Sequence, residues 1–524
     1  MSRNLVEIVR RHHAQQAPTA LEVLKEAMDL RGEITDDDRR VAAERSGLPE
    51  ASVYGVSTFY DDLLQPRAAR HVRVCTGTAC FVADAGVEAR VHAGLEGAED
   101  VSLAETVCLG FCHSSPAIRV NETIDAGPGV VDRVLNRTEQ PAREPEWTSR
   151  LAEPVLTRPG DWSGWETGRS PEDLLAEVKA ANVRGRGGAG FPAGTKWEFA
   201  AREEADEKFI VANGDEGDPG SYIDKYLMER NPMLLLEGMA LAGHAVGARH
   251  GFVLCRSEYP LSKPRLDAAA ALARDQGHLG EHFDVTILEG AGSYVVGEET
   301  ALLNCVQGLR GTVNARPPFP AQKGLFGKPT VVNNVETLCN IPAIARDGAA
   351  AYTNSKLVCF NERFANPGCV EVPFGMTVRE LCEDVAGGLK DGHTIKAVQI
   401  GGPLAGILPA QLLDARFDFD ALAEHGCMVG HGSILAFDET ADMRAVATHL
   451  LRFGADESCG KCFPCRIGLR RAYDQFASGA PVARKDFEAL LEVLEVSSLC
   501  AHGGGIPAPL RTLLTHFAGE LQLT

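Results

Sequence analysis

The sequence predicts a multidomain α/β protein, and three observations lead to this class. The chain has 524 residues, and at about 100–200 residues per domain this length corresponds to about three to five units. Stretches with helical spacing alternate with short β-branched runs along most of the chain. Hydrophobic residues make up 44% and charged residues 24% of the sequence, which is the ordinary composition of a folded globular protein.

The charge balance excludes some classes of partner. Lys and Arg total 52 against 72 Asp and Glu, giving a formal net charge of −20. A nucleic-acid binder or a protein that docks on anionic lipid needs a basic face, so we expect no nucleic acid and no membrane as partner. The longest apolar stretch contains Glu237 and His244 and is too short to span a bilayer. No targeting segment is recognisable at the start, and we therefore expect a cytoplasmic protein.

The units follow one another with recognisable changes in pattern. Residues 1–62 have helical spacing, for example from Leu21 to Ala27, and Thr35 is a candidate helix start. A strand-like run from His71 to Cys75 opens a small α/β unit, and residues 137–165 form a Pro-containing linker with little periodicity. The predicted units are 1–62 (helical), 63–136 (α/β), 137–165 (linker), 166–346 (Gly-rich α/β), 347–437 (strands with one helix) and 438–524 (helical).

The first cysteine set has the spacing of an iron–sulfur ligand set. Cys75 and Cys80 form C-x4-C, and after 27 residues Cys108 and Cys112 form C-x3-C. Two loops that each supply two thiolates suit a [2Fe–2S] cluster, because each pair completes one iron tetrahedron. Gly and Ala residues between the ligands let backbone N–H groups approach the sulfur atoms. The alternatives are structural zinc, which prefers C-x2-C pairs, and unrelated thiols.

The second cysteine set predicts a [4Fe–4S] cluster. Cys459, Cys462 and Cys465 form C-x2-C-x2-C, which wraps three corners of a cubane. Cys500 is the candidate for the fourth ligand, on pattern alone. Zinc would use two separated pairs instead of three cysteines plus one. The remaining cysteines have no ligand spacing, and we expect buried free thiols at Cys255, Cys305, Cys339, Cys359, Cys369, Cys382 and Cys427.

A glycine-rich run formally contains G-x-G-x-x-G between residues 184 and 190. It follows a helical segment, whereas the dinucleotide fingerprint must follow a strand, so the run does not by itself indicate an ordinary dinucleotide fold. Its backbone N–H groups could still face an anion, with Arg186 and Lys196 as phosphate partners. The competing interpretation is a flexible hinge.

Three further segments place polar residues at predicted strand ends. A strand from Phe209 to Asn213 runs into an acidic loop, 214–220, and polar groups at such ends form the ligand sites of α/β proteins. Residues 290–300 join glycines to adjacent acids, and residues 328–337 contain two consecutive Asn whose amides suit a heteroaromatic ring or a ribityl chain. A solvated turn is the commoner meaning of an acidic run such as 214–220, and a polar turn after a short strand is an equal alternative for residues 328–337 alone.

Together these segments resemble the flavin-bearing, NADH-oxidising subunit of respiratory complex I and its soluble relatives. The resemblance runs from about residue 165 to the C-terminus, and it rests on RGRGGAGFPAGTKW, NGDEGDPGSYIDKYLMERNP, GAGSYVVGEETALLN, PPFPAQKGLFGKPTVVNNVETL and ESCGKCFPCRIG with a distant SLC. The N-terminal region is similar to the small thioredoxin-like [2Fe–2S] subunit of complex I, on VYGVSTFYD, CTGTAC and CLGFCHSSP. This resemblance implies a thioredoxin-like unit after the N-terminal helices, a Rossmann-like FMN/NADH domain, a β-grasp (ubiquitin-like) domain and a C-terminal helical bundle.

The resemblance also implies the roles of individual residues. FMN would be bound by residues from all four loop segments, namely Gly185, Gly187, Lys196, Asn213, Asp215, Gly297, Glu298, Glu299, Asn333 and Asn334. The adenine of NAD(H) would stack between Phe191, Phe199 and Phe319, with Asp218 near a ribose. Arg316 stands where the family would have a Lys. FMN itself carries the hydride chemistry, so no protein residue is expected to act as a catalytic acid or base.

Fusions of this kind resemble the diaphorase subunits of NAD-dependent formate dehydrogenases and NAD-reducing hydrogenases. Complex I typically has Ala, Ser and Glu where this chain has Gly214, Gly217 and Asp218, and the loop is most similar to the β subunit of the formate enzymes. The expected partners are then a large molybdenum- or tungsten-containing subunit and a small [2Fe–2S] subunit. A hydrogenase diaphorase is the alternative within the enzyme class, and a zinc-bearing assembly module is the alternative outside it.

Overall fold

The computed structural model describes residues 5, 7–9, 13 and 17–524, so the helical prediction for the first 62 residues is tested mainly from Ala20 onward. Helix α3 begins after Thr35, whose hydroxyl oxygen accepts from the Asp38 N–H, so the predicted helix start is confirmed. The N-terminal helices are α2 (Ala20–Arg31), α3 (Asp36–Ser46), α4 (Glu50–Ser57) and α5 (Asp61–Leu64).

The first sheet has the strand order β2-β1-β3-β4, with β1 parallel to β2 and antiparallel to β3. Its strands are β1 (Arg70–Cys75), β2 (Val101–Thr106), β3 (Ala117–Val120) and β4 (Thr123–Ala126). The accompanying helices are α6 (Thr78–Ala83), α7 (Val87–Leu95) and α8 (Val130–Leu135). The chain therefore enters both cysteine loops from the carboxyl ends of two adjacent parallel strands.

The second sheet is fully parallel, with the order β8-β7-β6-β9. Its strands are β6 (Phe209–Gly214), β7 (His250–Cys255), β8 (Asp284–Glu289) and β9 (Thr330–Asn334). The helices around it are α9 (Pro171–Ala180), α10 (Ala193–Arg202), α11 (Ile223–Arg230), α12 (Pro232–Val246), α13 (Ser262–Asp275), α14 (Glu299–Val306), α15 (Pro320–Lys323), α16 (Val335–Cys339) and α17 (Ile341–Asp347).

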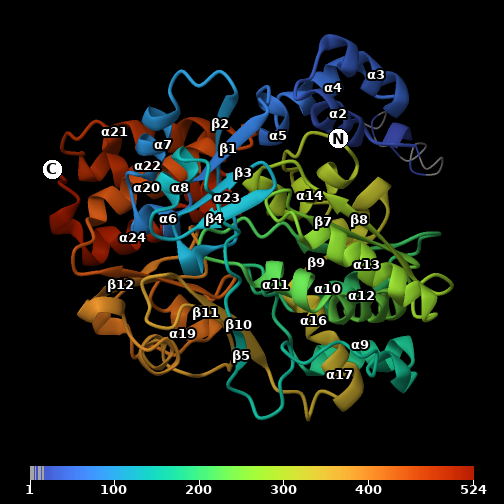
Figure 1. The fold of residues 1–524 in the computed structure, drawn as a ribbon. Coiled ribbons are helices and arrows are strands. Elements are labelled where there is room, and N and C mark those ends of the chain that lie inside the picture. The colour runs from blue at the N-terminus through green and yellow to red at the C-terminus, as the bar shows by residue number, and fades with distance from the viewer. Residues whose placement is uncertain (1–4, 6, 10–12, 14–16) are drawn as a thin grey trace.

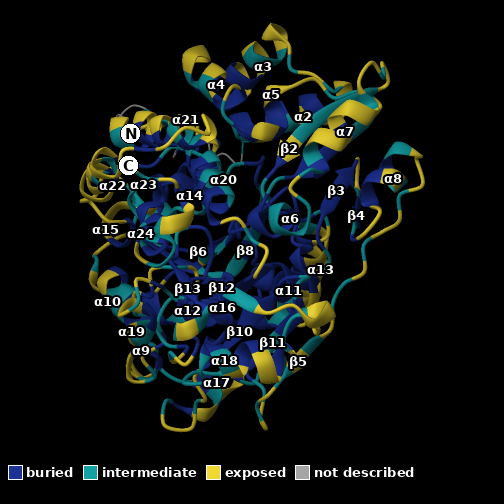
Figure 2. Cartoon of the chain, turned by 90° about the vertical axis from the view of Figure 1, so that its left-hand side faces the viewer, coloured by how far each residue is buried: buried dark blue, intermediate teal, exposed yellow. Residues whose placement is uncertain are grey.

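Alternating residues of this parallel sheet enter two different cores. Phe209 and Val211 pack with the N-terminal helices and α14, whereas Ile210 and Ala212 pack into the larger core formed with helices such as α12. Because side chains alternate along a strand, both faces of the sheet are covered, as expected for parallel strands. The buried residues accordingly concentrate on the central sheets, while exposed residues mark the outer helices (Figure 2).

The third sheet is mixed, with the order β13-β12-β14-β10-β11-β5. Its strands are β5 (Trp147–Ser149), β10 (Ser355–Phe360), β11 (Gly368–Pro373), β12 (Ile395–Ile400), β13 (Ile407–Pro409) and β14 (Ser433–Asp438). The short helices α18 (Val378–Glu380) and α19 (Phe419–Ala423) belong to this unit. Strand β5 comes from the segment predicted as a linker, so that segment is an edge strand of the sheet as well as a connection.

The C-terminal region is helical, as predicted, and lies beside the first sheet (Figure 1). Arg452 pairs with Glu88 at 2.8 Å and with Glu105 at 2.7 Å, which joins the two regions. The helices are α20 (Met443–Asp456), a π-helical turn (Pro464–Leu469), α21 (Arg470–Ala477), α22 (Arg484–Ser497), α23 (Ala501–Gly505) and α24 (Pro507–His516). Among the residues that the structure describes, no helix is long and apolar enough to cross a membrane.

Candidate active site

The carboxyl edge of the parallel sheet brings three of the four loop segments together. Asn213 at the end of β6 is the register partner of Asn334 at the end of β9. The Asn213 side chain donates to the Gly297 carbonyl oxygen at 2.8 Å, which ties the acidic loop to the segment after β8. Asn333 and Asn334 are therefore residues of the strand end and not of a turn.

The glycine-rich run is the fourth segment, and it lies against the same edge. A Cβ atom at Gly187 would come within 2.9 Å of the Asn334 Cβ, so only glycine fits this approach. The Arg186 N–H donates to the Thr337 hydroxyl at 2.9 Å. The Arg186 guanidinium instead donates to Asn354 and to the Ser355 carbonyl, so it holds the third sheet and does not extend freely toward a phosphate.

Asp215 carries the clearest sign of a missing ligand. It is buried, and its Oδ2 atom has no hydrogen-bond partner among the described residues. Burial raises the pKa of the Asp215 carboxyl to about 8, with Glu258 and Glu457 adding to the rise and Arg256 opposing it. A buried carboxyl oxygen without a partner is costly, and a hydroxyl-bearing group bound here would satisfy it. The site therefore fits a polyol chain such as the ribityl chain of FMN.

Several predicted cofactor residues already make internal bonds. Glu298 caps α14, since its Oε2 accepts from the Thr300 and Ala301 N–H groups at 2.8 and 3.1 Å. Glu299 pairs with Lys196 at 3.2 Å and with Arg316 at 2.7 Å.

Both asparagines of β9 are also engaged. Asn333 accepts from the indole N–H of Trp197 at 2.8 Å, and Asn334 caps α16 by accepting from the Thr337 N–H at 3.1 Å. These side chains are held rigidly at the edge of the sheet, which preorganises the site.

Three phenylalanines on or beside α10 and α15 are about half exposed. Phe191, Phe199 and Phe319 are 48%, 49% and 52% exposed. Phe199 lies on α10, and Phe191 precedes the N-cap residue of that helix. Phe319 occupies the N-cap position of α15 without a side-chain capping bond, and α15 packs against α10. Half-exposed aromatic rings on adjacent elements form a surface on which a planar base can stack.

Asp218 is placed differently from the phenylalanines. It is buried, its Oδ1 accepts from the Tyr294 hydroxyl at 2.6 Å, and its Oδ2 lies 2.5 Å from His431 Nδ1. The sequence interpretation did not single out Tyr294 or His431. Tyr294 belongs to a segment that was recognised, but His431 comes from the third sheet's unit and no local pattern marked it.

The first four thiols meet at one place. Cys75 ends β1, Cys80 lies on α6, and the Cys108 and Cys112 sulfur atoms are 3.5 Å apart. A hydrogen bond from Cys80 and the backbone N–H groups of three neighbouring residues lower the pKa of Cys75 to about 7. The hydrogen bond with Cys108, burial and the charges of Cys75 and Cys80 raise the pKa of Cys112. Four buried sulfur atoms with backbone N–H donors around them match the donor set of a [2Fe–2S] cluster.

The second four thiols also converge, and the fold brings Cys500 to the other three. Burial raises the pKa of Cys465 to about 12, and Cys459, Cys462 and Cys500 all lie close enough to add to this rise. The N–H groups of His502 and Gly503 hydrogen-bond to the Cys500 sulfur. Cys459 and Cys465 are buried, whereas Cys462 and Cys500 are half-buried. The remaining seven cysteines are all buried and free, as predicted.

Family models match the two cysteine regions and the parallel-sheet region of the chain separately. Residues 178–343 match the Nuo51 FMN-binding domain, residues 5–136 match the thioredoxin-like [2Fe-2S] ferredoxin, and residues 445–523 match the NADH-ubiquinone oxidoreductase-F iron-sulfur binding region. The NADP-reducing hydrogenase subunit HndC of Solidesulfovibrio fructosivorans is 41% identical over 374 residues, which is 67% of this chain and 76% of the relative. The chain belongs to the complex I 51-kDa (NuoF-like) family of FMN-binding subunits.

Another member and one solved structure extend this relationship. An NADH-quinone oxidoreductase subunit of Escherichia coli (strain K12) is 39% identical over 379 residues, covering 68% of this chain and 85% of that protein. A chain of the H2-reduced NAD+-reducing [NiFe]-hydrogenase superposes with a TM-score of 0.86 at 30% identity, covering 97% of this chain and 93% of the other.

Membership of the 51-kDa family establishes the cofactors. The chain is an NAD(H) oxidoreductase subunit with FMN, one thioredoxin-like [2Fe–2S] unit and one [4Fe–4S] unit. The four loop segments lie within or beside the matched FMN-binding range, and the two thiol sets lie within the two iron–sulfur ranges. The zinc alternative is thereby set aside.

Proposed function

We propose that the chain is the NAD(H)-reacting subunit of an NAD+-reducing hydrogenase-type complex. It would pass electrons between NAD(H) and a partner subunit that carries the second substrate. The observation that supports this proposal best is the superposition on the hydrogenase chain over 97% of the length. The 51-kDa relatives cover 67–68% of this chain, whereas the hydrogenase chain covers nearly all of it.

A second candidate is the β subunit of a formate dehydrogenase with a molybdenum or tungsten partner, and the acidic loop supports it. A Cβ atom at Gly214 would lie 2.6 Å from the Met228 sulfur, and one at Gly217 would lie 2.6 Å from a Tyr294 ring carbon. The Ala and Ser that complex I typically has at these positions would not fit this packing. The packing of these two glycines therefore distinguishes the loop from that of complex I. The similarity of the loop sequence to the formate enzymes is what favours this second candidate.

In the proposed site, the chain's own residues bind and orient the two nucleotides. When bound, FMN exchanges a hydride with NAD(H) and single electrons with iron–sulfur clusters. Gly185 and Gly187 keep the glycine-rich run close against Phe191 and Asn334, so that its backbone N–H groups would face the FMN phosphate, and Asp215 would accept a ribityl hydroxyl through its unpartnered oxygen. Phe191, Phe199 and Phe319 stack on the adenine and so hold the nicotinamide at the reaction distance. No side chain has to move a proton for the hydride step.

The thiols would hold the two clusters that take electrons away from the flavin. We propose as [2Fe–2S] ligands Cys75, Cys80, Cys108 and Cys112, and as [4Fe–4S] ligands Cys459, Cys462, Cys465 and Cys500. The second set lies nearer the surface, since Cys462 and Cys500 are half-buried. The [4Fe–4S] cluster is therefore the proposed exit toward the partner subunit.

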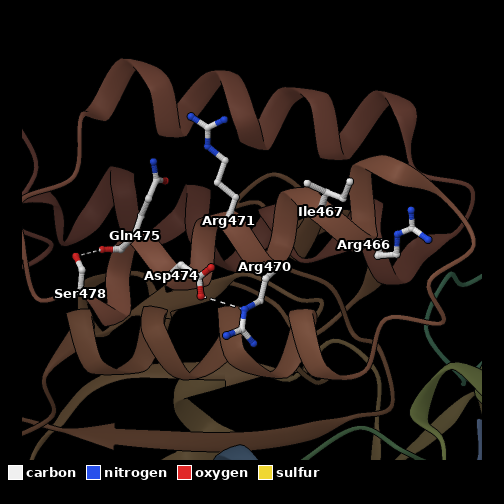
Figure 3. A pocket seen from close by; sticks show the side chains of 7 residues that line it. All are labelled: Arg466, Ile467, Arg470, Arg471, Asp474, Gln475 and Ser478. Atoms are coloured by element: carbon white, nitrogen blue, oxygen red, sulfur yellow. Dashed lines mark hydrogen bonds and ion pairs between the residues drawn. The ribbon is translucent and has the colours of Figure 1, made fainter.

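The surface around this motif supports an exit there. Phe463 is 70%, Ile467 54% and Val496 76% exposed, and all three stand within four residues of a candidate cluster cysteine in the sequence. Ile467 lines a cavity of about 610 Å³ together with Arg466, Arg470 and Arg471 (Figure 3). Arg470 is paired with Asp474 at 3.0 Å in the same lining. In a chain of net charge −20, an apolar surface with a basic rim fits an acidic partner subunit.

The test of the proposal is to purify the chain with whatever subunits accompany it and to measure metals and substrates together. A hydrogenase-type complex contains nickel and reduces NAD+ with H2. Molybdenum or tungsten with formate-dependent NAD+ reduction would instead identify the second candidate. A preparation that oxidises NADH with neither metal present would contradict both assignments of the partner.

A further inference from the structure

His431 contacts the acidic loop at the carboxyl edge of the parallel sheet, where FMN is proposed to bind, but it belongs to a different unit of the chain. It lies in the turn before β14, in the third sheet, and its side chain is only 13% exposed. Its Nδ1 atom is 2.5 Å from Asp218 Oδ2, and its Nε2 atom is 4.0 Å from Asp224 Oδ2. The imidazole ring therefore lies between a carboxylate of the acidic loop and a carboxylate of α11.

The backbone around His431 is fixed by close approaches on both sides. Gly430 forms a bridge with Gly188 of the glycine-rich run. Gly430 has a φ of +52°, and a Cβ atom there would lie 2.2 Å from the Gly401 carbonyl oxygen, so the turn requires glycine at this position. The His431 carbonyl accepts from Lys356 Nζ at 2.8 Å. The backbone that carries the His431 ring is consequently fixed relative to the glycine-rich run.

The groups that face His431 give it a positive charge. Burial lowers its pKa, but the carboxylates of Asp218, Asp224 and Glu216 outweigh burial and raise the pKa to about 9. Lys356, which donates to the His431 carbonyl, forms a buried pair with Glu336. His431 is thus the cation that directly contacts Asp218 at neutral pH.

Asp218 is held from two sides but keeps acceptor capacity. Tyr294 donates to Oδ1 and His431 to Oδ2. Each carboxylate oxygen has a second lone pair, so Asp218 can still accept from a hydroxyl of a bound nucleotide. Without His431 the carboxylate could rotate, and its charge would be less compensated close to the anionic NADH.

We propose that His431 is a positioning residue for NAD(H), which fixes Asp218 and offsets its negative charge. The inference rests on the proposed function, because it places the nucleotide at Asp218. It adds a residue from the third sheet's unit to a site that is otherwise built from the strand ends and loops of the parallel sheet. It also explains why the turn before β14 is packed against the glycine-rich run.

The experiment compares His431→Gln with His431→Asn in the full-length, cofactor-loaded chain. The Asn amide can donate from nearly the position of Nδ1, whereas the Gln amide is closer to the position of Nε2. NADH oxidation is measured with ferricyanide as acceptor, together with FMN content. His393→Gln is the control, because His393 forms an exposed pair with Glu439 at 2.8 Å in the same unit.

We expect His431→Gln to raise the KM for NADH about tenfold, as for a lost charge-assisted hydrogen bond. The kcat and the FMN content stay within about twofold of wild type, and His431→Asn recovers part of the KM. In an Asp218→Asn background, His431→Gln has little further effect, since the two residues act together.

Two results would overturn the proposal. One is an unchanged KM in His431→Gln. The other is a loss of FMN in which the flavin-loaded fraction keeps the wild-type KM, because that result indicates a purely structural role. Failure of the wild-type chain to oxidise NADH would contradict the proposed function itself, and it is therefore distinguishable from failure of the His431 proposal.

Discussion

Phe319 offers the sharpest test of the proposed nucleotide surface. It occupies the N-cap position of α15, its ring is 52% exposed, and α15 packs against α10, which carries the equally exposed Phe199. Phe319→Ala would remove one of the three proposed stacking faces. The chain should still fold, because a half-exposed ring contributes little to the core.

The size of the effect follows from the exposed area. A phenylalanine offers roughly 150–250 Å², so half of the ring corresponds to roughly 100 Å², and a base covering one face removes about 50 Å² from water. At ~25 cal/mol per Å² this gives about 1 kcal/mol, and aromatic pairing adds about 0.5–1.5 kcal/mol. The two contributions together give a loss of about 1.5–2.5 kcal/mol, or roughly a 10–70-fold rise in the KM for NADH.

The assay is NADH oxidation with ferricyanide, which accepts electrons from the flavin, together with measurement of bound FMN. The matched control is Leu272→Ala on α13, since Leu272 is 49% exposed and lies outside the phenylalanine surface. We expect full FMN content in both variants and a raised KM only in Phe319→Ala. An unchanged KM with full flavin would show that the Phe319 ring does not contact the nucleotide and would refute the stacking argument.

The remaining predictions concern the clusters, the buried carboxyl and the partner surface. Cys462→Ser should remove the [4Fe–4S] signal from the electron paramagnetic resonance spectrum. It should also reduce partner-linked NAD+ reduction but keep ferricyanide reduction by NADH. Full partner-linked activity in this variant would contradict the proposed exit path. Cys80→Ser should remove only the [2Fe–2S] signal, because its ligands come from a separate unit; loss of both signals would contradict separate ligand sets. The pKa of Asp215 is raised to about 8 in the folded state. The folded state therefore keeps a proton on this carboxyl that the unfolded state loses from about pH 4 upward. Because of this difference, the stability of the wild-type chain falls as the pH rises toward 8. Asp215→Asn lacks this titration, and its advantage in thermal unfolding of the flavin-free chain should grow between pH 5 and pH 8; a pH-independent difference would argue against a protonated Asp215. Val496→Asp should weaken partner-linked activity but not ferricyanide reduction, whereas Val41→Asp, on the N-terminal helix α3, should leave both unchanged; equal behaviour of the two variants would remove the case for this docking surface.

Local sequence patterns grouped the cysteines into the two sets whose thiols lie together in the structure, and they predicted elements that carry them. The strand runs ending at Cys75 and Asn213 and the helix start at Thr35 all appear in the structure. These features depend on neighbouring residues, so periodicity and capping chemistry are sufficient to find them. Cys500 was the least determined candidate ligand, because its place beside Cys465 depends on how α22 and α23 pack.

Contacts between distant segments could not be predicted in this way. Asp218 appeared as one acid in a polar loop, but its partner His431 lies 213 residues further along the chain. The segment 137–165 lacks periodicity and was interpreted as a linker. The Glu371 carboxylate accepts from the N–H groups of Val155 and Leu156, both at 2.9 Å, and this contact organises the segment.

Polar residues of the motifs can serve either as helix caps or as ligand contacts, and the sequence alone does not distinguish the two roles. Glu298 was expected to contact FMN, and one of its oxygens is used to cap α14. A helix cap and a ligand contact call for the same residue type at a strand-to-helix join. Only the geometry shows which atoms remain available, as it does for the unpartnered Asp215 Oδ2.

The most direct test of the account is an NADH titration of the anaerobically purified chain, with FMN, iron and acid-labile sulfide measured in the same sample. The account predicts one FMN, one [2Fe–2S] and one [4Fe–4S] cluster per chain, with NADH bleaching the flavin and reducing at least one cluster. Zinc in place of iron at both thiol sets, or a flavin that NADH does not bleach, would contradict it.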